Sequence, residues 1–128
     1  MNRTDFGNGI FAEIPPNWEM HKEDTISLYD PKSGVGALQL SFYSTTGNAP
    51  IDIASELGSF LEDRHEEVTV EDRKGYAYSE IGEDGVFWRY WLLNINGKVI
   101  FISYNSEKVY KGKEDPIVDA IVKSIKAG

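Results

Sequence analysis

One group of side chains has the residue types and spacing to bind a ligand. An arginine among tyrosines and a tryptophan can hold a carboxylate, a phosphate or a peptide side chain, and these residue types are enriched where proteins bind one another. The group is predicted to share one face of an antiparallel meander over residues 75–105 and comprises Tyr76, Tyr78, Glu80, Arg89, Trp91 and Tyr104. The structural alternative pairs Arg89 with Glu80 and packs the rings beneath a helix.

The downstream turn of the meander is Asn96-Gly97. Both central positions of a type I′ turn favour positive φ, which Asn and Gly adopt readily. With these two residues as the loop, Ile95 faces Lys98 and Arg89 faces Tyr104. The opposite face then carries a second, largely apolar set: Trp88, Tyr90, Leu92, Val99, Phe101 and Ser103.

The upstream turn lies within Gly82–Gly85 and leaves two alternatives, with Glu83-Asp84 or Asp84-Gly85 as the loop residues. The choice shifts the strand pairing by two residues, which changes no residue's face. Both alternatives place Glu80 directly or diagonally across from Arg89.

Two apolar sheet faces require cover on both sides, because an antiparallel sheet with one wet face alternates between apolar and polar residues. One amphipathic helix is predicted over about residues 51–65. A second helix is expected to start at Asp115-Pro116, with Asp115 as the cap and Pro116 at the first helical position. Its apolar stripe is Ile117, Val118, Ile121, Val122 and Ile125.

The remaining strands are predicted at Gly9–Ile14, Thr25–Tyr29 and Val35–Tyr43, with extended pieces at Trp18–His21 and Val68–Val70. We expect a single domain over residues 1–128 with a polar, frayed start at residues 1–8. The predicted class is α+β. The predicted architecture is an α/β/α sandwich in which two main helices cover a central, mainly antiparallel sheet of about six strands.

Charge suggests a second candidate surface. The formal net charge is −8, which disfavours nucleic acid as a partner and mildly favours a basic protein. Acidic residues gather at the end of the first predicted helix, at Glu62, Asp63, Glu66 and Glu67. They form a predicted surface for a basic partner, whereas the alternative is a solvated helix end that only confers solubility.

Other chemistries find no support in the sequence. There is no cysteine, and His21 and His65 have no metal-ligand spacing around them. No serine stands in a nucleophile elbow, and no glycine-rich loop follows a strand and opens a helix. We therefore predict no catalytic residue, no metal and no cofactor. No apolar run reaches the length of a membrane span, so we expect a cytoplasmic protein that does not bind membranes.

The element order and certain residues resemble the PsbP-like fold family, which includes extrinsic proteins of photosystem II, a Ran-binding nuclear-import factor and many bacterial domains of unknown role. The matching segments are Phe11–Trp18, with its Pro-x-x-Trp ending, Ile26–Pro31, Asn96-Gly97-Lys98 and Ile117–Ile125. The resemblance implies an α/β/α sandwich and a binding role rather than a catalytic one. It transfers no metal-binding residue and no Ran-binding residue to this chain.

Together these observations predict a non-enzymatic domain of a bacterial type that acts through protein–protein contact. One specific version is an immunity or inhibitor protein that neutralises a basic partner. The alternative is a module that binds a small molecule or peptide on the face of Arg89. That alternative requires an open pocket in which Arg89 is unpaired.

Overall fold

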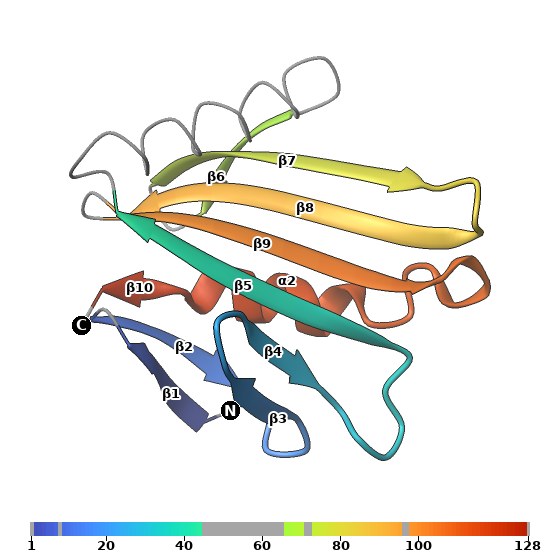
Figure 1. Cartoon of the computed structure of the whole chain (residues 1–128), viewed down its shortest axis with the longest axis horizontal. Coiled ribbons are helices and arrows are strands. Elements are labelled where there is room, and N and C mark those ends of the chain that lie inside the picture. The colour runs from blue at the N-terminus through green and yellow to red at the C-terminus, as the bar shows by residue number, and fades with distance from the viewer. Residues whose placement is uncertain (1, 8, 45–65, 71–72, 96–97, 128) are drawn as a thin grey trace.

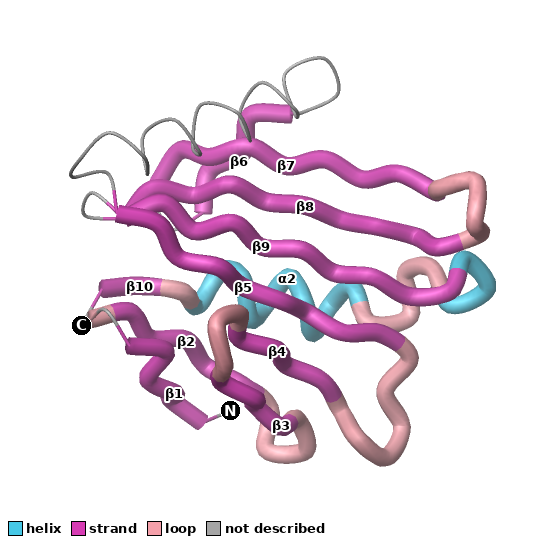
Figure 2. The backbone as a smooth tube through the Cα atoms, in the orientation of Figure 1, coloured by secondary structure: helices cyan, strands magenta, loops and turns pink. Residues whose placement is uncertain are grey.

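The computed structural model of this chain describes residues 2–7, 9–44, 66–70, 73–95 and 98–127 (Figures 1 and 2). Its elements follow the chain in this order: β1 (Asn2–Gly7), β2 (Ile10–Ile14), β3 (Glu19–Lys22), β4 (Ile26–Tyr29), β5 (Gly36–Ser44), β6 (Glu66–Val70), β7 (Arg73–Ile81), β8 (Val86–Ile95), β9 (Lys98–Glu107), the short 3₁₀ helix η1 (Lys108–Tyr110), α2 (Asp115–Ser124) and β10 (Lys126–Ala127).

Within these residues the strands form two antiparallel sheets. The large sheet has seven strands in the order β3-β4-β5-β9-β8-β7-β6, and the small sheet has three in the order β1-β2-β10. The α+β class is confirmed. The described residues form more strands than the single sheet of about six that was predicted. Among the described residues α2 is the one α-helix, and the helix predicted over residues 51–65 lies outside them. No described helix has the length and apolar character needed to cross a membrane.

The beginning of the chain is paired rather than frayed. Asn2–Gly7 forms β1, which runs antiparallel to β2. The anchor is Phe6, which is 1% exposed and belongs to the hydrophobic core. The prediction of a frayed start was wrong because it followed from the polar residues that dominate this segment. It did not take account of the single buried aromatic side chain, Phe6.

The core lies between the large sheet and a layer formed by α2 and the small sheet. In Figure 1, β5 passes in front of α2, and β2 and β10 lie beside the helix. The buried cluster draws on both layers, with Leu38, Ile100 and Ile102 from the large sheet and Phe6 and Ile10 from the small one. The small sheet therefore shares the covering of this face with the helix.

The helix α2 inserts the predicted apolar stripe into this core, with one exception. Val118, Ile121, Val122 and Ile125 are buried, whereas Ile117 is 37% exposed. Residues seven apart lie nearly in line on a helix, which puts Ile117 in line with Ser124. The backbone amide of Glu13 in β2 donates a hydrogen bond to Ser124 Oγ at 2.8 Å. Ile117 thus lies at the margin of the helix contact and not at its centre.

The register between β8 and β9 matches the prediction. Ile95 pairs with Lys98 and Arg89 pairs with Tyr104. Residues 96–97, the predicted turn, lie outside the described residues. This pairing confirms that Arg89, Trp91 and Tyr104 share one face, and that Trp88 and Tyr90 belong to the other.

The turn between β7 and β8 has three loop residues, so the two-residue alternatives were both wrong. Ile81 pairs with Phe87, and the Gly82 amide donates to the Val86 carbonyl at 2.9 Å. The loop is therefore residues 83–85, closed by Gly85 with a φ of 79°. A three-residue hairpin loop commonly ends in such a left-handed residue, which glycine adopts without a steric cost.

One additional loop residue exchanges the faces of β7, because strand side chains alternate with a period of two. Tyr76 pairs with Leu92, Tyr78 with Tyr90, and Glu80 with Trp88. These three residues therefore belong to the face opposite Arg89. The predicted group of six residues is divided between the two sides of the sheet.

Candidate functional site

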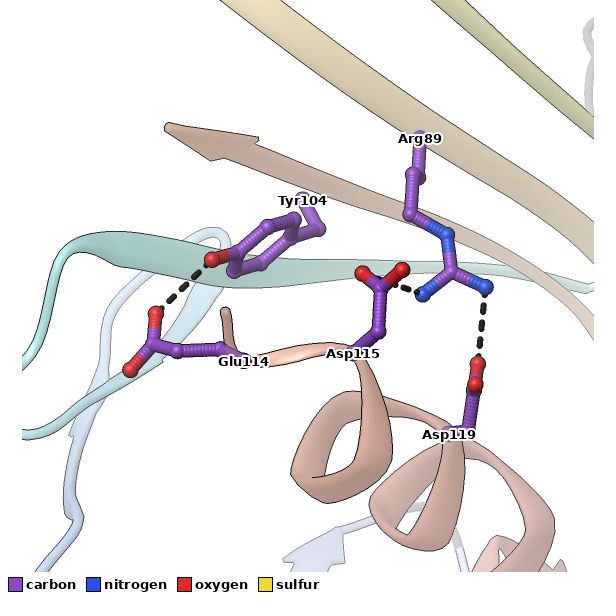
Figure 3. Close-up of polar contacts among 5 residues, drawn as sticks. All are labelled: Arg89, Tyr104, Glu114, Asp115 and Asp119. Atoms are coloured by element: carbon purple, nitrogen blue, oxygen red, sulfur yellow. Dashed lines mark hydrogen bonds and ion pairs between the residues drawn. The ribbon is translucent and has the colours of Figure 1, made fainter. Parts of the chain in front are cut away.

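The polar cluster at the start of α2 is the main constellation of charged groups on the covered face (Figure 3). Arg89 Nη1 lies 3.1 Å from Asp115 Oδ1, and Arg89 Nη2 lies 2.7 Å from Asp119 Oδ1. Strand β8 supplies the arginine and α2 supplies both carboxylates. Asp115 and Asp119 are four residues apart, which puts them on the same side of a helix.

The guanidinium group of Arg89 has a third contact within its own strand. It lies 4.5 Å from the ring centroid of Trp91, which is a favourable cation–π distance. The Arg89 side chain is 19% exposed. The predicted pairing of Arg89 with Glu80 is wrong, because the three-residue turn puts Glu80 on the other face. The alternative function required an unpaired Arg89, and the two ion pairs do not meet that requirement.

A second polar contact joins Tyr104 of β9 to Glu114, the residue before α2. The Tyr104 hydroxyl donates to Glu114 Oε1 at 2.7 Å. Tyr104 is 1% exposed and Glu114 is 7% exposed. Burial, together with the hydrogen bond to Glu114, raises the pKa of Tyr104 above its ordinary value. The hydroxyl therefore stays protonated and acts as a donor.

The absence of a side chain at Gly36 makes room for this contact. A β-carbon at Gly36 would collide with the backbone oxygen of Asn105 and would lie 2.6 Å from the Tyr104 hydroxyl oxygen. Gly36 is the first residue of β5 and pairs with Ser106. The Tyr104 ring thus occupies space beside the backbone of β5 that only glycine leaves open.

The start of α2 differs from the predicted cap. Glu114 is the N-cap residue and makes no side-chain hydrogen bond to the helix, because its carboxylate accepts from Tyr104 instead. Asp115 lies in the first turn, where a negative charge is favourable to the helix dipole. Pro116 is the second residue of the helix, one position later than predicted. The carboxylates here bind sheet side chains, and this arrangement fastens the helix to the sheet.

The opposite face of the sheet carries a row of aromatic rings. The rings of Trp88 and Tyr90 stack at 5.8 Å between centroids, and those of Tyr90 and Phe101 stack at 6.0 Å. All three side chains are half-buried. Glu80 joins this face through its pairing with Trp88. Tyr76 and Tyr78 belong to this face by register, through their pairing with Leu92 and Tyr90.

The acidic candidate surface is described only in part. Glu62 and Asp63 lie outside the described residues. Glu66 and Glu67 begin strand β6 and pair with Ala77 and Tyr76. These two residues therefore belong to an edge strand of the large sheet and not to the end of a helix.

The histidines show no metal chemistry in the described part of the chain. His21 Nε2 lies 2.6 Å from the Tyr29 hydroxyl, and the two rings stack on an exposed surface. His65 lies outside the described residues. Among the residues that are described, no three histidine, aspartate or glutamate side chains are close enough together to hold a metal ion.

The two segments that carry the family resemblance near the start of the chain are hydrogen-bonded to each other. Asn17 Nδ2 donates to Asp30 Oδ2 at 2.9 Å, and Ser33 Oγ donates to the same oxygen at 2.8 Å. Asp30 Oδ1 accepts from the Lys32 amide at 3.0 Å. This bond to the Lys32 amide, with the bonds from Ser33 and Asn17, lowers the pKa of Asp30 to about 2. Asp30 is thus a structural carboxylate that holds two turns together.

Sequence reasoning missed Glu114, Asp115 and Asp119 as partners of the predicted site, since it assigned Asp115 only a capping role. A signal for Asp119 was present, because Asp115 and Asp119 have helical spacing within a helix that was predicted to cover this sheet. No comparable signal marks Glu114, since its contact depends on the space beside Gly36. Residues whose roles depend on close tertiary packing leave little trace in local sequence.

Comparison with known proteins identifies the fold. No protein-family model matches the chain, and no curated protein matches it. A protein of Bacteroides thetaiotaomicron has a similar structure, with a TM-score of 0.70 and 14% identity over 94% of this chain. The match covers 45% of that protein, so the present chain spans less than half of its length.

Two further solved structures match over almost the whole of both chains. Cyanobacterial PsbP (CyanoP) of Synechocystis has a TM-score of 0.66 and 10% identity, and covers 99% of this chain and 92% of its own. The Ran-binding protein Mog1p of Saccharomyces cerevisiae has a TM-score of 0.58 and 11% identity, and covers 99% of this chain and 96% of its own. The strands and the helix of this chain therefore share one α+β fold with these two proteins. That fold is the PsbP/Mog1-like fold.

Proposed function

We propose that this chain is a non-enzymatic protein-interaction domain and that its partner is a basic protein. The observation that carries the first part is the shared fold, because the structural neighbour Mog1p is a Ran-binding protein and its match covers nearly all of both chains. The polar cluster beneath α2 agrees with this, since its arginine and tyrosine are engaged in holding the helix.

The basic character of the partner rests on charge. The chain has 21 acidic and 13 basic residues and a formal net charge of −8. Opposite charges speed the encounter of two proteins and favour correct partners over wrong ones. The proposed contact surface comprises Glu62, Asp63, Glu66 and Glu67. An immunity or inhibitor role in the cytoplasm, in which this surface neutralises a basic protein, is the specific form of the proposal.

The test is retention of proteins from the native cell extract on the immobilised chain at low and at high salt. A basic protein that is retained at low salt and released at high salt would support the proposal, because salt screens exposed charges. The decisive variant reverses the four carboxylates of the proposed surface to lysine. It should lose the retained protein.

A matched control reverses four carboxylates outside the proposed surface and so changes the net charge equally. Suitable residues are Glu13, Glu19, Glu23 and Asp24, all of which are exposed. If both variants lose the partner equally, the overall charge rather than the proposed surface is responsible. If neither variant loses it, the basic-partner proposal fails while the protein-interaction function can still hold.

A further inference from the structure

A patch of mixed chemistry lies at the end of the large sheet where β7 ends and β9 leads into η1. Large apolar side chains are exposed there: Ile81 is 51% exposed, Val109 75% and Tyr110 40%. On the described surface, only Ile117 is another large apolar residue of this kind. Exposed apolar groups that gather at one place mark interaction sites more often than scattered ones do.

The patch contains charges of both signs in two neighbouring segments. The turn between β7 and β8 carries Glu83 and Asp84, and the segment after β9 carries Lys108, Lys111 and Lys113, all of them exposed. The Lys108 amide donates to the Gly85 carbonyl at 3.0 Å, which fixes the two segments side by side. In Figure 1 both segments lie at the same end of the molecule.

The basic segment has defined local contacts. The Lys111 ammonium lies 5.5 Å from the ring centroid of Phe87, and the Lys113 ammonium lies 5.6 Å from that of Tyr110. Asp84 Oδ1 accepts from the Val86 amide at 3.1 Å. The acidic turn and the basic segment are thus both anchored to the start of β8. Each has a definite position relative to the other.

We infer that this patch is a self-complementary surface that binds a second copy of this chain. In a two-fold interface residue i of one copy meets residue j of the other, and j meets i. A two-fold axis between the two segments places the acidic turn of each copy on the basic segment of the other, and places Ile81 against Val109 and Tyr110. An anionic membrane offers no such match, because it would repel Glu83 and Asp84.

The experiment measures self-association of the purified chain by sedimentation equilibrium at about 0.15 M salt, where charges farther apart than roughly 8 Å are screened. One variant reverses the acidic turn, Glu83→Lys with Asp84→Lys, and a second reverses the basic segment, Lys108→Glu with Lys111→Glu. Each variant alone should raise the dimer dissociation constant by at least about tenfold, because it places like charges opposite each other. An equimolar mixture of the two variants should restore association as a heterodimer.

The matched control is Glu23→Lys with Asp24→Lys, which makes the same chemical change in the turn between β3 and β4. Ile26, just after that turn, pairs with Leu40, which pairs with Ile102 in the middle of β9. The control turn is therefore distant from the end of β9, where the patch lies. This control should associate like the unmodified chain. If the chain stays monomeric at all concentrations up to about 1 mM, its dissociation constant lies beyond that of very weak complexes. That result would overturn the inference. Equal loss in the control, or no restoration in the mixture, would overturn it as well.

Discussion

Two polar contacts fasten the same end of α2 to the sheet, and they differ in how far water reaches them. Tyr104 and Glu114 are almost completely buried. The Arg89 side chain is 19% exposed, and its partners Asp115 and Asp119 are 38% and 48% exposed. A buried polar group that loses its partner cannot turn to water, whereas an exposed one can. Loss of the Tyr104–Glu114 hydrogen bond should therefore lower the free energy of unfolding more than loss of the two ion pairs of Arg89.

The most damaging change to the buried contact should be Gly36→Ala. The new methyl group would collide with the Asn105 backbone oxygen and displace the Tyr104 hydroxyl. Overpacking and a lost buried hydrogen bond together should lower the free energy of unfolding by about 3–4 kcal/mol. Urea denaturation measures this directly. A loss of less than about 1 kcal/mol, the size of an ordinary surface effect, would mean that the strand shifts to make room.

Removal of the hydroxyl alone, in Tyr104→Phe, keeps the packing and leaves Glu114 without its donor. An unsatisfied buried acceptor should cost about 2 kcal/mol of unfolding free energy. Glu114→Gln is the companion variant, since the amide can still accept from Tyr104. If Glu114→Gln destabilises the chain more than Tyr104→Phe does, the carboxylate has a role beyond this hydrogen bond.

The same contact predicts a decline in stability at alkaline pH. The pKa of Tyr104 is raised in the folded chain. Its contribution to stability is therefore complete below the unfolded pKa of about 10 and is lost as the pH rises toward the folded value. The difference in unfolding free energy between the unmodified chain and Tyr104→Phe should shrink above about pH 10. A difference that stays constant between pH 8 and pH 11, in denaturation carried out across that range, would contradict the assignment.

The smallest effect should follow from breaking the ion pairs. Arg89→Met keeps an unbranched chain over Trp91 and removes the charge. Because the pairs are partly exposed, we expect a loss of about 0.5–1 kcal/mol. The loss should decrease further at about 1 M salt, where screening extends to short distances. The effect of Tyr104→Phe should be insensitive to salt, so the two contacts can be separated by this measurement alone.

The sequence could predict the features that depend on local patterns, but not those that depend on how α2 packs on the sheet. The register of β8 on β9 and the buried stripe of α2 follow from local turn chemistry and helical spacing, and both were correct apart from Ile117. The partners of Arg89 and Tyr104 depend on where α2 meets the sheet, and local patterns do not encode that position. Glu80 was assigned to the wrong face because a turn with Gly85 at its end has one more loop residue than the common two-residue turn.

The candidate site was also predicted only in part. The sequence placed Arg89, Trp91 and Tyr104 together correctly, since a single well-marked turn governs all three. It could not show that the guanidinium group of Arg89 and the hydroxyl of Tyr104 already have partners on or beside α2. The acidic residues Glu62 and Asp63 lie outside the described residues, so their role stays a prediction.

The three-residue turn between β7 and β8 has a consequence for how this chain can change over time. Deletion of one loop residue would restore a two-residue turn and reverse every residue of β7, so that Ala77 and Ser79 exchange faces with their neighbours. Substitutions at Glu83 or Asp84 carry no such penalty, provided that Gly85 remains. We therefore expect diverging lineages to keep the length of this turn whatever residues occupy positions 83 and 84. An insertion of two residues would be tolerated more readily than a deletion of one.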